Sequence, residues 1–250
     1  ICDALNIVLK KTEFQKIKSM IKIIRYSSND NVTKNISSIC DARLIWGGDE
    51  TINKIRENSL QPRAFDITFA DRYSLCVING DEFVKEIRPE KIIERFFNDT
   101  FLFDQNACTS PHSVLWIGST SKVEKAKNIF WDKLCALVSS SYEIQPVTAV
   151  DKLTDFYNQA IKSEKVILEN KKDNLIFRIK LDSLNGDLDC FRSHSGYFSE
   201  YHASSLMDLS KIINKKYQTL AYYGFTKEHL SNVIRKIGPT GIDRIVPIGR

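Results

Sequence analysis

The hydrophobic and polar positions of the first 80 residues change period several times, which indicates alternating helices and strands. Leu5, Val8 and Leu9 have helical spacing, whereas the run MIKIIRY is short, apolar and rich in β-branched residues, as strands are. The predicted elements are, in order, a helix over 4–16, a strand over 20–26, a helix over 31–39, a strand over 42–48, a helix over 49–57 and strands over 64–69 and 74–79. Alternation at this pitch predicts βαβ units around a parallel sheet, and therefore an α/β fold.

The rest of the chain continues the alternation with longer helices. Pro89 suits the first turn of a helix, and Gly238-Pro239 ends the last one. The dipeptide Asn185-Gly186 favours the two-residue turn of a β-hairpin. The predicted elements are a helix over 89–103, a strand over 113–118, helices over 121–138 and 151–162, a hairpin over 174–192, a helix over 206–214, a strand over 219–225, a helix over 227–237 and a strand over 241–249.

Composition places the chain among ordinary globular proteins. Its 250 residues are 42% hydrophobic and 27% charged, which is enough apolar material for one large domain or two medium ones. The 36 basic residues exceed the 31 acidic ones by 5, an excess that suits an anionic ligand but is too small to indicate nucleic-acid binding. No apolar run is long enough to span a bilayer, and we expect no signal peptide.

The six cysteines are scattered, and no pair has the C-x-x-C spacing. Neither they nor the four histidines fall at zinc-ligand spacing, so we expect neither a disulfide framework nor a metal site. This usage is typical of a reducing compartment, and we expect a cytoplasmic protein. The chain starts at Ile1 without a methionine and ends on VPIGR, so we expect an internal piece of a longer protein.

Cys108 is the strongest candidate for chemistry. It lies in the polar loop DQNACTSP, between a predicted helix and a predicted strand, whereas the other cysteines lie within element patterns or at the start of the chain. Backbone N–H groups exposed by such a loop lower the pKa of a thiol and can hold an oxyanion. Cys108 is therefore either a nucleophile or, as most cysteines are, a structural thiol.

Two neighbours of Cys108 have candidate roles in the same site. Asn106 is a candidate for supporting the loop. His112 is a candidate base, although it lies four positions away across a proline and no carboxylate stands nearby to orient it. The alternative for His112 is a polar residue at the start of a strand.

The segment WGGDE is the candidate cofactor turn. Trp46 ends a predicted strand, Gly47 and Gly48 follow, and a helix begins directly after them. A dinucleotide can approach the backbone closely at such a turn. The full G-x-G-x-x-G pattern is absent, so a simple tight turn between strand and helix is the alternative.

Three segments together resemble the aldehyde dehydrogenase superfamily. QNACTSPHSVLW is similar to its catalytic-cysteine segment, and RLIWGGDETINKIR is similar to its strand–glycine–helix element beside the nicotinamide. The stretch from GYFSEYHASS to RIVPIG is similar to its run of strand, helix, Tyr-Gly, helix and return strand. FDQNACTSPHSVLWIG with GIDRIVPIGR resembles one branch closely, the fatty acyl reductase of bacterial bioluminescence, which acts on long-chain acyl-protein or acyl-CoA thioesters.

The resemblance covers nearly the whole chain and implies a domain organisation and a reaction. Residues 1–80 would be the carboxyl-terminal part of a Rossmann-type dinucleotide-binding domain, and residues 81–250 the catalytic domain. Cys108 would take the acyl group, NADPH would deliver a hydride, and a fatty aldehyde would leave. The implied partners are a fatty acyl-protein synthetase and an acyltransferase, and the aldehyde would supply luciferase. A short-chain acyl-CoA reductase, an aldehyde dehydrogenase of the same superfamily and a catalytically silent scaffold subunit are the alternatives.

The sequence also departs from the superfamily. Hydrolysing members carry a glutamate base in a Glu-Leu-Gly-Gly segment, but the corresponding region here, RAFDITFADRYSLCVI, has only Asp66 and Asp71 as acids. Such a base would hydrolyse the acyl-enzyme, so its absence favours a reductase. The Glu-x-Phe-Gly-Pro ribose contact is also missing, and SHSGYF stands in its place.

Overall fold

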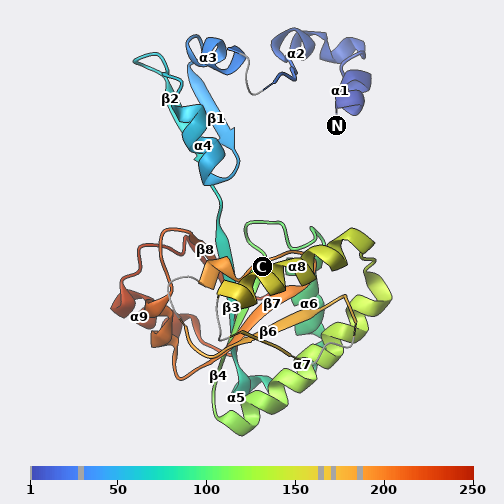
Figure 1. Cartoon of the computed structure of the whole chain (residues 1–250), viewed down its shortest axis with the longest axis vertical. Coiled ribbons are helices and arrows are strands. Elements are labelled where there is room, and N and C mark those ends of the chain that lie inside the picture. The colour runs from blue at the N-terminus through green and yellow to red at the C-terminus, as the bar shows by residue number, and fades with distance from the viewer. Residues whose placement is uncertain (1, 28–30, 163–165, 170–172, 185–187) are drawn as a thin grey trace. The chain divides into compact units, whose positions relative to one another are not determined.

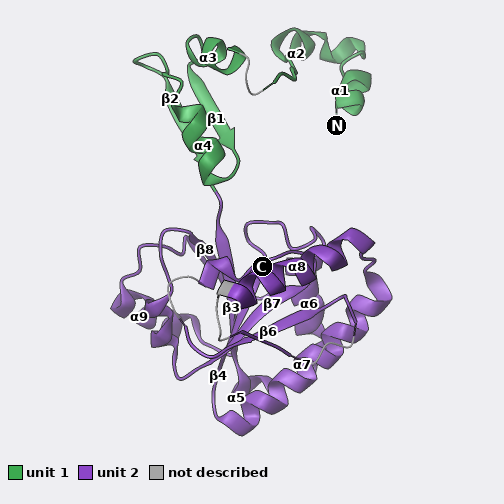
Figure 2. Ribbon diagram, in the orientation of Figure 1, with its two compact units in different colours: residues 1–70 green, residues 71–250 purple. Residues whose placement is uncertain are grey.

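Two separate sheets organise the chain in the computed structural model, which describes residues 2–27, 31–162, 166–169, 173–184 and 188–250 (Figure 1). Each sheet belongs to its own compact unit, residues 1–70 and residues 71–250 (Figure 2). Among the described residues, no helix combines the length and the apolar character that crossing a membrane requires.

The first unit is built on two parallel strands. Its elements are α1 (Cys2–Val8), the 3₁₀ helix η1 (Thr12–Phe14), α2 (Gln15–Met20), α3 (Val32–Ser37), β1 (Ala42–Trp46), α4 (Asp49–Arg56) and β2 (Phe65–Phe69). On one face of the sheet, Ile45 is buried and Arg43 binds the Asp66 carboxylate through Nε at 2.7 Å and Nη2 at 3.0 Å. On the other face, Leu44, Trp46 and Phe65 are exposed.

The amino-terminal part of this unit differs from the prediction. The helix expected over 4–16 is broken into three short helical pieces, none of which buries a side chain. The strand expected over 20–26 does not form: Met20 ends α2, and residues 21–27 pair with no strand among the described residues. A strand needs a partner for its backbone hydrogen bonds, so a β-branched apolar run alone does not produce one.

The second unit is organised by a mixed seven-stranded sheet in the order β5-β6-β7-β4-β3-β8-β9. Only β5 runs antiparallel to its neighbour, and the pairs from β6 to β9 are parallel. The strands are β3 (Tyr73–Asn79), β4 (Pro111–Ile117), β5 (Val166–Leu168), β6 (Phe177–Leu181), β7 (Tyr197–Ala203), β8 (Tyr217–Tyr223) and β9 (Arg244–Pro247). The expected α/β class is therefore confirmed.

Helices cover both faces of this sheet (Figure 1). Cys76 and Ile78 of β3 pack against α5 (Gly80–Phe83), α6 (Pro89–Phe101) and α7 (Thr120–Ser141). Leu75 and Val77 face the opposite side, which is covered by α8 (Pro146–Lys162), the 3₁₀ helix η3 (Leu206–Lys211) and α9 (Lys227–Ile237). Successive residues of β3 and β4 point to opposite faces of the sheet, and both faces are covered. Nearly every position is therefore buried, and the two strands appear in the sequence as continuous apolar runs.

The boundary between the units lies ten residues earlier than the expected division after residue 80. Strand β3 pairs with β4 on one side and with β8 on the other, so it belongs to the second unit. The roles expected of residues 1–80 and 81–250, dinucleotide binding and catalysis, stay predictions.

Three further elements differ from the prediction. The hairpin expected over 174–192 does not form, because β6 pairs with β5 and β7, and Leu188–Cys190 is a 3₁₀ helix. Its expected turn at Asn185-Gly186 lies outside the described residues. The helix expected over 206–214 is also 3₁₀, and the pattern alone missed α5, β5 and β7.

A buried carboxylate anchors the face of the sheet beneath α7. Glu200 of β7 is 2% exposed and accepts hydrogen bonds from the indole N–H groups of Trp116 and Trp131, both at 2.8 Å. Its second oxygen accepts from Arg178 Nε at 2.7 Å. Three donors thus offset the cost of burying this charge.

Candidate active site

Cys108 lies in the loop between α6 and β4, at the amino ends of the parallel strands, and it is exposed. The N–H of Ser110 donates to the carbonyl of Ala107 at 2.9 Å, which closes a four-residue turn with Cys108 and Thr109 at its centre. The structure therefore presents the thiol at the tip of a short, closed turn.

The buried side chain of Gln105 fastens this loop to the sheet. Its Nε2 donates to the carbonyls of Pro111 at 2.9 Å and Tyr197 at 3.0 Å. Its Oε1 accepts from the N–H groups of Gly196 and Tyr197, both at 2.9 Å. Gln105 is fully buried and has φ of 60°. Its side-chain amide hydrogen-bonds backbone groups of the loop and of β7, as another peptide group would. Sequence reasoning missed this role, because a glutamine in a polar loop is usually a surface residue.

Serine hydroxyls hold the loop from two further sides. Ser74 Oγ donates to the carbonyl of Cys108 at 2.7 Å, and Ser110 Oγ donates to the carbonyl of Asp99 at 2.7 Å. Asp99 accepts in turn from the N–H of Gly249 at 2.7 Å, and burial raises the pKa of its carboxyl. Nothing in the sequence pattern pointed to Ser74, which stands at the start of an apolar strand.

The backbone around the thiol keeps unused donors. Within the described part of the chain, the N–H groups of Ala107, Cys108 and Thr109 donate to no protein group. Unpaired backbone N–H groups of this kind can hold the oxygen of a tetrahedral adduct. The turn therefore combines an exposed sulfur with donors that suit a developing negative charge.

The two predicted neighbours of Cys108 have different surroundings. The side chain of Asn106 is exposed, and only its N–H takes part in the loop, donating to Phe103 at 2.8 Å. His112 is 6% exposed and stacks on Tyr73, with its Nδ1 lacking a partner among the described residues. Burial, assisted by Arg192, lowers the pKa of His112 to about 3, so the imidazole is neutral at neutral pH and a weak proton acceptor.

Both acids of the region that corresponds to the glutamate base of hydrolysing aldehyde dehydrogenases are paired with arginines. Within the first unit, Asp66 is bound by Arg43 and lies 3.4 Å from Arg56, and the Arg43 hydrogen bond lowers the pKa of the Asp66 carboxyl. Within the second unit, Asp71 pairs with Arg192 at 2.7 Å. Carboxylates held by arginine are poor bases, because a nearby cation disfavours protonation.

The candidate cofactor turn lies within the first unit, at the carboxyl end of β1. Trp46 is 78% exposed and stacks on Phe69 with ring centroids 4.3 Å apart. A Cβ at Gly47 would meet Thr51, whereas a Cβ at Gly48 would meet nothing within 4 Å, so the backbone at Gly48 is open to a ligand.

Acids restrict what can bind at this turn. Asp49 and Glu50 occupy the first turn of α4, and their charge opposes a phosphate at this helix terminus. The turn therefore fits an uncharged ring, such as the nicotinamide part of a dinucleotide, better than it fits the phosphates.

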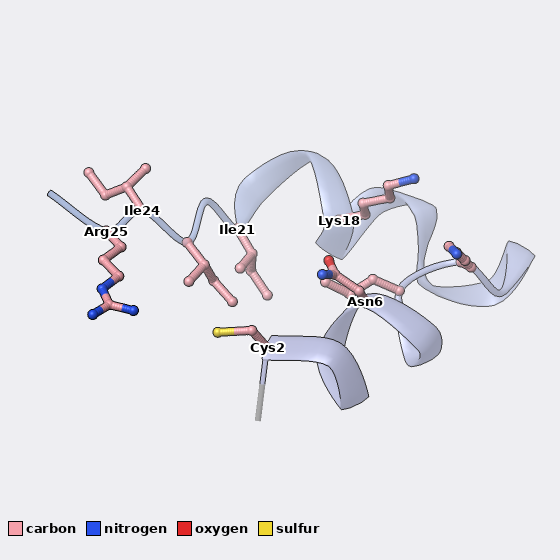
Figure 3. A pocket seen from close by; sticks show the side chains of 9 residues that line it. Cys2, Asn6, Lys18, Ile21, Ile24 and Arg25 are labelled. Carbon is pink, nitrogen blue, oxygen red and sulfur yellow. The ribbon is translucent and has the colours of Figure 1, made fainter.

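Two other hollows are less suited to chemistry. One of about 610 Å³ lies among residues 2–25 of the first unit, where Figure 3 shows Cys2, Asn6 and Ile21 around it. The helices beside it bury no side chain, so it is a gap between loosely packed elements. The other, of about 470 Å³, lies at the carboxyl ends of the central strands of the second sheet, where open α/β sheets commonly bind ligands. Four of its polar side chains, those of Asn79, Ser204, Ser205 and Thr226, are already engaged in local hydrogen bonds.

The fold is that of the aldehyde dehydrogenases. The chain is similar to betaine aldehyde dehydrogenase from Staphylococcus aureus, with a TM-score of 0.62 and 11% identity over 90% of this chain and 47% of that one. It is similar to succinate-semialdehyde dehydrogenase from Burkholderia pseudomallei, with a TM-score of 0.61 and 11% identity over 95% and 52%. An NADP-dependent enzyme from E. coli gives a TM-score of 0.61 and 8% identity over 91% and 49%. The chain thus spans about half the length of these structures.

The family model of the acyl-CoA reductases named LuxC matches residues 3–250, and the chain belongs to this family. Curated proteins gave no significant sequence match. The resemblance inferred from the cysteine segment is therefore confirmed at the level of family and fold: the chain belongs to the LuxC family of acyl-CoA reductases and has the fold of the aldehyde dehydrogenases.

Proposed function

We propose that the full-length protein reduces long-chain fatty acyl thioesters to fatty aldehydes with NADPH, through an acyl group carried on Cys108. The observation that carries the proposal is the turn at Cys108: an exposed thiol flanked by three backbone N–H groups without acceptors among the described residues. The family description, acyl-CoA reductase, supports the reaction class.

The first step is acyl transfer to Cys108. The thiolate sulfur bonds to the carbonyl carbon of the thioester, and the bond from that carbon to the leaving thiol breaks after a tetrahedral adduct has formed. Gln105 and Ser74 hold the turn, so the backbone donors are in place before the charge develops on oxygen. The leaving thiolate takes up the proton that the Cys108 thiol released.

Reduction requires a nicotinamide cofactor, which supplies a hydride to the carbonyl carbon of the acyl group. The turn of Gly47 and Gly48 would hold the cofactor, with the backbone open at Gly48, and Trp46 offers an exposed aromatic face there. Among the similar structures, one is described as NADP-dependent and another as an NAD-dependent benzaldehyde dehydrogenase, which supports a nicotinamide cofactor. After reduction, Cys108 leaves as thiolate and takes a proton from solvent, and the aldehyde is released.

The surroundings of the acyl-enzyme favour reduction over hydrolysis. Water attacks a thioester slowly unless a base removes its proton. Arg43 lowers the pKa of the Asp66 carboxyl, and burial lowers the pKa of His112 to about 3, so both are weak bases for this step. Asp71 is paired with Arg192. We therefore expect acyl-enzyme without NADPH to decay slowly, and added NADPH to discharge it mainly as aldehyde.

The proposed biological setting follows from the family resemblance. A fatty acyl-protein synthetase and an acyltransferase would supply the acyl group, and a luciferase would consume the aldehyde. A cytoplasmic location would give these partners access to NADPH.

The decisive experiment compares two exposed thiols in the full-length protein. Cys108→Ser should lose labelling by radiolabelled hexadecanoyl-CoA, whereas Cys190→Ser, which removes another exposed cysteine, should keep it. Normal labelling of the Cys108 variant would contradict the proposal. Faster labelling by acetyl-CoA than by hexadecanoyl-CoA would instead indicate a short-chain reductase, and release of free acid without cofactor would indicate a hydrolytic base.

A further inference from the structure

The hydroxyl of Ser74 lies directly beneath the candidate nucleophile. Ser74 is fully buried near the start of β3, and its Oγ is 2.7 Å from the carbonyl oxygen of Cys108 and 3.1 Å from the backbone nitrogen of Thr219. The Thr219 N–H can only donate, so it uses a lone pair of Ser74 Oγ. The hydroxyl proton is then directed to the carbonyl of Cys108, and the direction of this bond is fixed.

This bond also fixes a donor on the other side of the same peptide group. The carbonyl of Cys108 and the N–H of Thr109 share one peptide plane, and no peptide bond among the described residues is cis. The two groups therefore point in opposite directions. Because the carbonyl points into the core at Ser74, the N–H of Thr109 points outward, to the side on which Cys108 is exposed.

We infer that Ser74 is a positioning residue for acyl transfer, because it aims the N–H of Thr109 at the substrate carbonyl oxygen. The inference deepens, and rests on, the proposed role of Cys108. When the Cys108 sulfur bonds to the carbonyl carbon, the carbon–oxygen π electrons move to oxygen, and the Thr109 N–H donates to that negative oxygen. The double bond re-forms as the leaving thiolate departs with its electron pair and takes up the proton released by Cys108.

The test separates a reaction that builds up negative charge on oxygen from one that does not. Alkylation of Cys108 by iodoacetamide displaces iodide and forms no oxyanion, whereas acyl transfer from hexadecanoyl-CoA passes through one. In full-length Ser74→Ala, the acyl-transfer rate should fall about 10- to 100-fold, which is less than the loss of about 100- to 1,000-fold on removing an oxyanion donor, because the Thr109 N–H is displaced rather than removed. The alkylation rate should stay within about 3-fold of wild type, so the ratio of the two rates carries the result.

The matched control is Ser113→Ala. Ser113 is also a buried serine, and its hydroxyl bonds Tyr73 and Ser199 rather than the cysteine loop. Its ratio of acyl transfer to alkylation should equal that of wild type. If Ser74→Ala does not fold, the size-matched variants Ser74→Thr and Ser74→Val make the same comparison, with slow transfer expected in the valine variant alone.

The outcomes distinguish the inference from the proposed function. If Cys108→Ser still takes up the acyl group at the wild-type rate, the proposed function fails. The inference about Ser74 is overturned, while the role of Cys108 stands, by either of two results. One is that Cys108 is required but Ser74→Ala keeps the wild-type ratio of acyl transfer to alkylation. The other is that Ser74→Val and Ser74→Thr give equal ratios.

Discussion

The buried imidazole of His112 predicts a specific loss of stability in mild acid. In the folded chain the pKa of His112 falls from its ordinary 6.5 to about 3, because burial and then Arg192 disfavour the charged form, while Asp71 opposes them more weakly. Below pH 6.5 the unfolded chain therefore binds a proton that the folded chain does not, and stability falls as pH is lowered toward 3. Each pH unit in this window costs about 1.4 kcal/mol.

The magnitude can be isolated with one substitution. Two units below 6.5, at pH 4.5, His112 should cost the wild type about 2.7 kcal/mol of unfolding free energy relative to its value near neutrality. His112→Phe keeps a ring against Tyr73 and removes the titrating group, so its stability should lack this component. The difference between the two proteins cancels the contribution of every other titrating residue.

The assay is urea unfolding of both proteins between pH 4.5 and 7.5, followed by tryptophan fluorescence. Trp116 lies on β4, the strand that also carries His112, and Trp131 lies on α7, and both are buried in the second unit. His229→Gln is the control, because it removes an imidazole that is exposed on α9 instead of the buried one. Parallel curves for wild type and His112→Phe would refute the assignment of a neutral, buried imidazole.

Two further predictions test other parts of the chain. Glu200→Leu leaves two buried indole N–H groups and Arg178 without their acceptor, so the unfolding free energy should fall by about 3–5 kcal/mol. A loss below about 1 kcal/mol, measured by urea unfolding, would contradict this. Gly48→Val fills open space at the cofactor turn, so it should weaken NADPH binding at least about 10-fold while acylation of Cys108 persists. Unchanged NADPH affinity in a fluorescence titration would contradict the placement of the cofactor.

The sequence predicted the elements whose signals are local. Helix α9 forms over the expected residues because Thr226 caps its first turn through an N–H···Oγ bond from His229 and Gly238 ends it in the left-handed conformation. Strands β3 and β4 were predictable because both faces are buried, which leaves a long apolar run.

Elements that depend on distant partners were not predictable in this way. Residues 20–26 have the composition of a strand, but pairing is a property of two segments and not of one. The run Phe177–Leu181 was correctly expected to be extended, yet its partners proved to be β5 and β7 rather than the stretch that follows it. Strand β7 was indicated only by the family resemblance.

The same distinction applies to the site. The position of Cys108 on a loop followed from the polar residues around it. The groups that hold the loop, Gln105 and Ser74, act through contacts with Tyr197 and Thr219, which are more than 90 residues away in sequence. No local pattern could reveal those contacts, because the neighbouring sequence does not distinguish a buried glutamine from one on the surface.

The amide of Gln105 has a practical consequence for redesign of substrate preference. Gln105 and Gly196 form a rigid frame, since a side chain at Gly196 would collide with the carbonyl of Leu175 and the ring of Phe101. Ala107 and Thr109, by contrast, are half-exposed beside the sulfur. A mutant library could therefore vary Ala107 and Thr109 and keep Gln105 and Gly196. It would change the side chains that contact an incoming acyl chain and leave the position of the Cys108 thiol unchanged.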